Sequence, residues 1–260
     1  MPASAPELLR ELRRTAALGG GLLLAMAFSL SALAEASYAL RWLLPGTATW
    51  GLVVWQCRSR LHKNYSTEDG TAYSQLGLGN RITLLRGLLI AATAGFLATA
   101  GITTHSLLLF VPAALYTAAA LGDALDGYLA RRQGQTTLLG RELDTALDAL
   151  GLLVAPLLAI LTGKLHFSYL LVSFAYYLFK GGIHWRQRHN RPVYALPPSR
   201  LRRQLAGFQM GLVAAALWPP LPAELTRPAG LLFMLPLLIG FVRDWLYVSG
   251  RLGNNQEPPL

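Results

Sequence analysis

The 260-residue sequence has little charge and almost no cysteine. Charged residues make up only 14% of the chain and apolar residues 53%, whereas a soluble domain carries about 25% charged residues. A small water-soluble core cannot bury so much apolar surface, so the composition excludes an ordinary soluble domain and indicates a membrane protein. Cys57 is the only cysteine, which excludes an internal disulfide and a cysteine-based metal site.

The charged residues that are present are mostly basic, and the formal net charge is +10. They cluster in short segments between apolar runs and form no continuous basic face. This is the positive-inside pattern of membrane proteins, whose short cytoplasmic loops also meet anionic lipid headgroups. We therefore expect contact with a lipid bilayer and no binding of nucleic acid.

Long apolar runs predict an all-α polytopic membrane protein, because roughly 20 apolar residues cross the bilayer core as a helix. The predicted spans are residues 15–33, 42–55, 83–100, 107–125, 143–161, 167–183, 205–221 and 229–248. The segment 42–55 is short and contains Pro45, so it is expected to be either a tilted span or a re-entrant piece. The count is eight with this segment and seven without it. Eight spans place most basic residues, including a basic loop from Lys180 to Arg203, on the cytoplasmic side.

The polar stretch 64–77 has no apolar periodicity and predicts a linker. It separates an N-terminal membrane hairpin, residues 1–63, from a six-span body, residues 78–250. The remaining residues, 251–260, form a short polar tail that contains proline, and we expect it to lack regular structure.

Four of the six aspartates fall within 26 residues, at or near the ends of two predicted spans: Asp123, Asp126, Asp144 and Asp148. An ionised carboxylate at membrane depth costs about 2.5–3.5 kcal/mol on insertion scales, so four together require compensating charge. The spacings of three and four residues put each pair on one face of its helix. A turn in the polar segment 133–137 would make the two helices antiparallel and bring both pairs together.

Four adjacent carboxylates repel one another unless cations lie among them. Oxygen-only ligands suit hard ions, so the cluster predicts Mg²⁺ or Mn²⁺, with room for two ions. Two such ions clamp both sides of a phosphoryl displacement. Two alternatives remain open from the residues alone. The carboxylates are neutralised by Arg131, Arg132 and Arg141 in an interfacial charge network, or they form the proton or cation site of a transporter.

Two glycines and an arginine accompany the carboxylates. Gly127 follows Asp126 directly, and Gly140 lies one helical turn before Asp144. A glycine at such a position lets a ligand or a neighbouring helix approach the backbone closely. Arg131 lies one turn beyond Gly127 and is placed to pair with a phosphate.

This run resembles the signature of the CDP-alcohol phosphotransferase family, D-x2-D-G-x2-A-R-x8-G-x3-D-x3-D. All eight fixed positions are filled, by Asp123, Asp126, Gly127, Ala130, Arg131, Gly140, Asp144 and Asp148. The resemblance extends over about residues 76–250. It implies a body of six transmembrane helices, usually in a homodimer, with a site open to the cytoplasm; we expect a bacterial inner membrane.

The resemblance also implies roles for individual residues. Asp123, Asp126 and Asp144 would bind the metal pair. Asp148 would complete this site and act as the general base toward the acceptor hydroxyl. The CDP moiety would be contacted by Gly127, Arg131, Thr137 and Gly140.

A second, weaker match lies upstream, where Asn80, Thr83 and Arg86 resemble the N-x2-T-x2-R pattern of the family's first helix. The resemblance implies a polar strip that faces the nucleotide. The alternative is an N-cap region in which Arg86 extends to the membrane interface.

The implied reaction transfers a phosphatidyl group from a CDP-linked donor, with CDP-diacylglycerol expected, to a small polar alcohol, and releases CMP in phospholipid biosynthesis. Thr145 and Ala149 replace the proline and lysine that are usual in the phosphatidylglycerophosphate synthase branch, which weakens the case for glycerol phosphate as acceptor. Two other functions remain open: transfer of a headgroup from CDP-choline or CDP-ethanolamine to diacylglycerol, and a non-enzymatic transporter or scaffold.

Overall fold

The computed structural model describes residues 5–102, 105–132, 136–196 and 199–252, without the side chains of residues 5, 124, 126–132, 200 and 203. Eight α-helices occur in the described residues: α1 (Ala5–Leu33), α2 (Ala36–Arg60), α3 (Gly77–Gly95), α4 (Phe110–Arg132), α5 (Leu138–Leu161), α6 (Leu170–Arg188), α7 (Arg200–Leu217) and α8 (Ala223–Val248). Short 3-10 helices are η1 (Leu61–Lys63), η2 (Phe96–Thr99), η3 (Ser106–Leu109) and η4 (Phe167–Tyr169). The predicted all-α membrane fold is confirmed.

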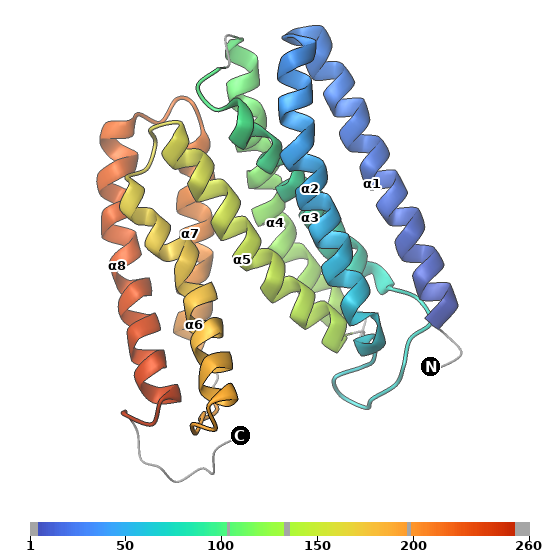
Figure 1. Ribbon diagram of the computed structural model, residues 1–260, viewed down its shortest axis with the longest axis vertical. Helices are drawn as coiled ribbons and strands as arrows, with labels where there is room; N and C mark the ends of the chain where they lie inside the picture. Colours follow the sequence, from blue (N-terminus) through green and yellow to red (C-terminus); the bar gives the residue numbers. More distant parts are fainter. Residues whose placement is uncertain (1–4, 103–104, 133–135, 197–198, 253–260) are drawn as a thin grey trace.

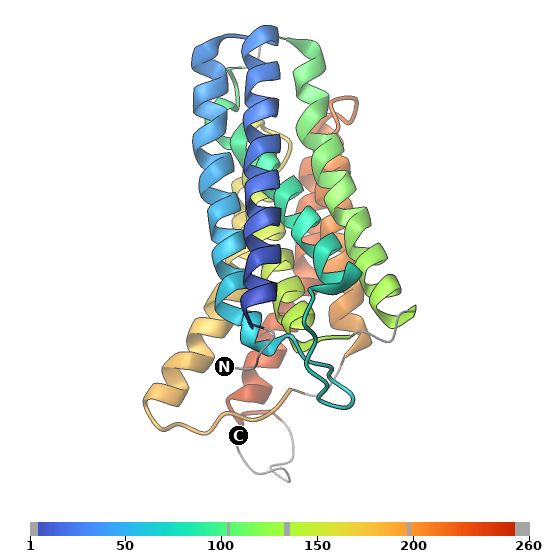
Figure 2. The same cartoon turned by 90° about the vertical axis from the view of Figure 1, so that its right-hand side faces the viewer.

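The helices run up and down in one bundle (Figure 1). The α1–α2 hairpin lies on one side, α3, α4 and α5 lie in the middle, and α6, α7 and α8 lie on the other side. The start of α1, the end of α8 and the loop before α3 are at the same end of the bundle (Figures 1 and 2). This is the end at which α4 finishes and α5 begins.

Five stretches of the described chain are long and apolar enough to cross a membrane: Pro6–Leu33, Gly77–Thr99, Ser106–Asp123, Leu138–Leu161 and Ala223–Val248. Of these, Gly77–Thr99 is the most buried inside the protein, at 72%. The helix α3 is therefore the central helix of the bundle, and its neighbours α2, α4 and α5 surround it.

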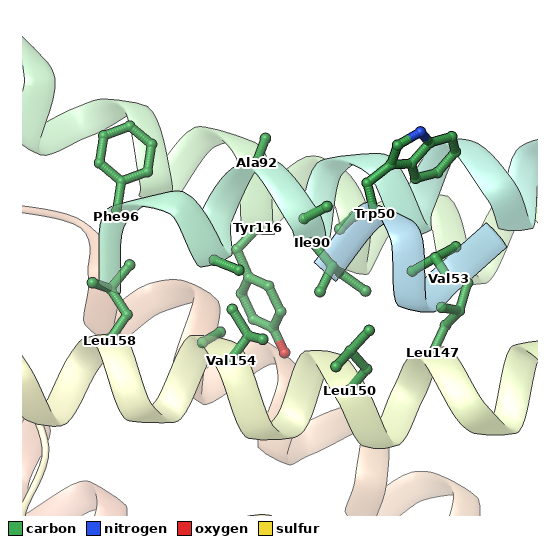
Figure 3. Packing of buried hydrophobic residues seen from close by; sticks show 14 of the residues in the cluster. Trp50, Val53, Ile90, Ala92, Phe96, Tyr116, Leu147, Leu150, Val154 and Leu158 are labelled. Atoms are coloured by element: carbon green, nitrogen blue, oxygen red, sulfur yellow. The ribbon is translucent and has the colours of Figure 1, made fainter. Parts of the chain in front are cut away.

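The N-terminal hairpin packs tightly on α3 through large side chains of α2. Trp42 and Val53 are both fully buried. A side chain at Gly95 would place its Cβ 2.4 Å from Nε1 of Trp42, so a residue without a side chain is needed there. Figure 3 shows Val53 of α2 and Leu147 of α5 lying side by side beneath α3. The hairpin thus extends the core of the body.

For one segment the structure excludes one of two expected forms, and for another the prediction is wrong. Residues 42–55 are not re-entrant, because they lie within the continuous 25-residue helix α2, which holds Pro45 in its interior. Membrane helices tolerate proline when neighbouring groups satisfy the freed backbone. The basic stretch from Lys180 to Arg203 is not one loop either. Its first part is the end of α6 and its last part is the start of α7, because these helices continue past their apolar runs into polar surroundings.

Candidate functional site

Three of the four signature aspartates converge at the end of the bundle where α4 finishes and α5 begins. Asp123 comes from α4, and Asp144 and Asp148 come from α5. Each offers one carboxylate oxygen, and these oxygens all lie within 4.8 Å of one another. Asp126 is within α4, but its side chain is outside the described part of the chain. The antiparallel approach expected from the spacing is therefore present for three carboxylates.

Arg86 of α3 lies in the middle of this cluster. Its Nη2 is 2.7 Å from Oδ1 of Asp123 and 2.7 Å from Oδ1 of Asp148, and its Nη1 is 2.5 Å from Oδ1 of Asp144. The Arg86 side chain is only 2% exposed, whereas the three carboxylates are about one-third exposed. One buried cation therefore compensates three carboxylates that open toward the surface.

The placement of Arg86 excludes the interfacial interpretation, whereas a nucleotide-facing role stays a prediction. The Arg86 side chain does not extend to the interface, because it is buried, and its Nε also donates to the carbonyl of Ala119 at 3.3 Å. Its stem fits because the neighbouring helix has Gly122, where a Cβ would lie 2.8 Å from Cγ of Arg86. Arg141, one of the three arginines considered as counter-charges, is exposed. The side chains of Arg131 and Arg132 are outside the described residues.

The donor set fits a hard divalent ion. All three groups are carboxylates, their oxygens are close enough to share an ion, and the partial exposure leaves an approach from the surface. Mg²⁺ and Mn²⁺ prefer such oxygen ligands, and Mg²⁺ commonly keeps several waters beside a few carboxylates. A divalent ion here would share the carboxylates with Arg86.

A second group of predicted site residues holds the first turn of α5. Thr137 is its N-cap, and the Thr137 hydroxyl accepts from the backbone N–H of Gly140 at 3.0 Å. The Asn80 amide of α3 donates to the same hydroxyl at 3.2 Å. Both side chains are buried, so in this structure their polar groups are engaged within the protein. Thr83 is buried as well and donates to the carbonyl of Gly79 at 3.0 Å.

Substituting Gly140→Ala is expected to lower stability. The new Cβ would lie 2.5 Å from Oδ1 of Asn80, so the amide would move away from Thr137. Overpacking of this kind costs about 1–3 kcal/mol. Thermal unfolding of the protein in lipid measures the loss. The control is Gly211→Ala in α7, where a Cβ has nothing within 4 Å. Equal melting temperatures for the two variants would contradict the close approach.

A cavity of about 200 Å³ adjoins Asp148 between α5, α6, α7 and α8. Most of its lining is apolar, and includes Ala149, Leu152, Val172, Leu205, Leu237 and Phe241. Ser173 lines it with a buried hydroxyl that has no hydrogen-bond partner among the described residues. An ion pair between Arg202 and Asp244, 3.3 Å long, forms another part of the wall. Asp148 thus contacts the carboxylate cluster on one side and a mostly apolar space on the other.

Sequence reasoning missed two features of the site. The sequence pattern places Arg86 in one strip with Asn80 and Thr83, whereas of these three described side chains Arg86 is the one that contacts the carboxylates. An isolated arginine inside an apolar span was the available signal, because such a residue needs a nearby anion. Glu142 was not singled out, although Lys63 and Arg60 contact it from the end of the hairpin.

Gly127 and Arg131, the other expected CDP contacts, belong to α4, but their surroundings lie outside the described part of the structure.

A model of the CDP-alcohol phosphatidyltransferase family matches residues 76–243, which is more than half of the chain and includes all four aspartates. No curated protein and no solved structure gives a significant match. The matched segment begins just before α3 and leaves the α1–α2 hairpin outside. The chain therefore belongs to the CDP-alcohol phosphatidyltransferase family.

Proposed function

We propose that this protein transfers a phosphatidyl group from CDP-diacylglycerol to a small polar alcohol and releases CMP, in phospholipid biosynthesis. Membership of the family implies phosphatidyl transfer from a CDP-alcohol; the donor and the acceptor are the proposed part. The observation that supports this reaction best is the convergence of Asp123, Asp144 and Asp148 within 4.8 Å. Such a cluster suits phosphoryl chemistry more than a structural ion pair, because among the described side chains three carboxylates share the charge of Arg86 and stay about one-third exposed.

We assign the metal site to Asp123, Asp126, Asp144 and Asp148. When bound there, Mg²⁺ or Mn²⁺, with two ions expected, would neutralise the charge that develops on the phosphoryl oxygens and on CMP. Arg86 keeps the carboxylates together, because its two terminal nitrogens contact all three described members of the set. This positioning fixes the distance between α4 and α5 before substrate arrives.

Asp148 is the proposed general base. Arg86 contacts its Oδ1, which leaves Oδ2 for the proton of the acceptor hydroxyl. As this proton transfers, the acceptor oxygen forms a bond to the phosphorus that carries the diacylglycerol, and the bond from that phosphorus to the oxygen of CMP breaks. The proposed contacts to the CDP moiety are made by Gly127, Arg131, Thr137 and Gly140, with Asn80 and Thr83 on the neighbouring helix.

The proposed setting is a bacterial inner membrane, with the site facing the cytoplasm and the protein forming a homodimer. The basic ends of α2 and α6, with Arg58, Arg60, Arg186 and Arg188, support this orientation because positive residues favour the cytoplasmic side. We divide the chain into the hairpin 1–63, the linker 64–77, the catalytic unit 78–250 and the tail 251–260. In this orientation the lipid donor reaches the site from the bilayer, and the polar acceptor reaches it from the cytoplasm.

A second candidate is transfer of a headgroup from CDP-choline or CDP-ethanolamine to diacylglycerol. The apolar lining of the cavity beside Asp148 favours this possibility, because a lipid acceptor would place its apolar part there. Purified protein in lipid, supplied in parallel with labelled CDP-diacylglycerol and labelled CDP-choline, separates the two. We expect label in lipid product only from CDP-diacylglycerol, with glycerol phosphate, inositol phosphate, inositol and serine tested as acceptors. Label transferred only from CDP-choline would reverse the assignment.

Removal of divalent ions is expected to abolish turnover. Without them no divalent charge opposes the charge on the leaving CMP, and Arg86 is already held among three carboxylates. CMP release should fall to background in EDTA and return on addition of excess Mg²⁺ or Mn²⁺. Undiminished release from metal-free protein would contradict the assigned metal site.

A further inference from the structure

The chain between the hairpin and α3 lies against the start of α5. This linker, residues 64–76, follows η1 and precedes α3, and it is at the end of the bundle where α1 begins (Figure 2). Its first residues pair with the segment that leads into α5. The backbone N–H of Leu138 donates to the carbonyl of Tyr65 at 3.1 Å, and that of Thr67 donates to the carbonyl of Thr136 at 3.0 Å. Ser66 and Thr137 form an antiparallel bridge.

Buried amides connect this pairing to the site. The Asn64 side chain is 3% exposed and donates to the carbonyls of Tyr73 and Gln75, at 3.1 and 2.9 Å. Its Oδ1 accepts from the amide of Asn80 at 3.2 Å. Asn80 in turn contacts Thr137, the N-cap of α5. A continuous series of hydrogen bonds thus runs from the linker to the helix that carries Asp144 and Asp148.

Two ion pairs reinforce the same contact. Lys63 Nζ is 2.6 Å from Oε1 of Glu142, and Arg60 Nε is 3.4 Å from Oε2 of the same residue. Glu142 lies two residues before Asp144 on α5. Ion pairs that are one-third exposed contribute little to the stability of a fold. We infer that these two pairs instead fix the position of the start of α5 relative to the end of α2.

We propose that the hairpin and residues 64–75 of the linker, which lie outside the family match, position the first turn of α5, and through it Asp144 and Asp148, for catalysis. The brace consists of Arg60, Lys63, Asn64 and the backbone of residues 65–67. It acts on Thr137 and Glu142, and none of its members belongs to the proposed metal or CDP sites. The kinetic consequence of the brace rests on the proposed function, whereas its structural consequence does not.

The variant Asn64→Ala tests the brace in the full-length protein in lipid nanodiscs. Two quantities are measured: backbone hydrogen exchange at residues 138–142, and the dependence of CMP release on the concentrations of donor and Mn²⁺. We expect faster exchange at the start of α5, because the series of hydrogen bonds is cut. We expect a fall in kcat/KM of about 10-fold, with higher half-saturating Mn²⁺, as when groups that orient metal ligands are removed.

The partly exposed pair Lys63–Glu142 gives a second variant that leaves the core untouched. Lys63→Glu should raise the Mn²⁺ concentration that gives half-maximal CMP release. The double variant Lys63→Glu with Glu142→Lys restores the ion pair in reverse and should bring this concentration most of the way back to that of the parent. The matched control is Glu11→Gln. Glu11 also joins the hairpin to the body, through Arg81 at 2.8 Å, but it does not contact α5. This control should stay within about twofold of the parent in both measurements, since surface pairs contribute little.

The outcomes separate the brace from the proposed function. Unchanged hydrogen exchange at the start of α5 in Asn64→Ala would overturn the brace. Faster exchange with unchanged kinetics would overturn its role in positioning. Faster exchange in a protein whose parent releases no CMP from any donor would support the brace and reject the proposed function.

Discussion

Asp148→Asn is expected to lower kcat for CMP release by about 10³-fold, within the range for loss of a general base. The amide cannot take the proton of the acceptor hydroxyl, and it is a poorer ligand for a divalent ion. The fold should survive, because an amide oxygen can still accept from Nη2 of Arg86. In the parent this nitrogen is 2.7 Å from Oδ1 of Asp148. Single-turnover CMP release at saturating donor and metal measures the loss.

The matched control for this variant is Asp69→Asn. Asp69 is an exposed aspartate of the linker, and its carboxylate accepts from the hydroxyl and the backbone N–H of Thr71 at 2.7 and 3.1 Å. We expect its kcat to equal that of the parent. Equal kcat values for Asp148→Asn and Asp69→Asn would remove Asp148 from the mechanism.

Among the variants proposed here, Arg86→Met is expected to lower the free energy of unfolding of the metal-free protein most. The variant keeps an apolar stem against Gly122 but leaves three carboxylates without their buried cation. Breaking a buried pair costs about 3–5 kcal/mol; we expect about 3 kcal/mol, the lower end, because the carboxylates are partly exposed. Denaturant unfolding in EDTA measures this loss.

Divalent ions distinguish charge compensation from simple packing in this variant. Mg²⁺ or Mn²⁺ should raise the melting temperature of Arg86→Met more than that of the parent, because the freed carboxylates bind the ion more tightly. The control is Arg81→Met on the same helix. The Arg81 side chain is 49% exposed and pairs with Glu11 at 2.8 Å, so this variant should lose less than about 1 kcal/mol. A melting temperature of Arg86→Met that does not respond to metal would contradict the shared site.

Much of the fold follows from local patterns. Apolar runs predicted the helices because spanning a bilayer requires a fixed length of apolar chain. Helix ends were misplaced, since α2 and α6 continue into polar residues that hydropathy does not register. Pro45 suggested a break, yet α2 is continuous. Whether proline interrupts a helix depends on the packing around it, which a single sequence does not contain.

The approach of the aspartates was predictable because their spacing and the short connection restrict two helices to one geometry. Asp123, Asp144 and Asp148 indeed lie together. The central position of Arg86 was not predictable, because it depends on how α3 is rotated against α4 and α5. The pairing of the linker with Thr136 and Leu138 was equally hidden, since irregular segments have no periodicity from which contacts can be inferred.

The most direct test of the account is CMP release by the purified protein in lipid, with CDP-diacylglycerol, the four acceptors and either Mg²⁺ or Mn²⁺. We expect CMP formation that matches the amount of new phospholipid and that disappears in EDTA. Absence of CMP with every acceptor and either metal, from protein that is folded by its thermal transition, would contradict it.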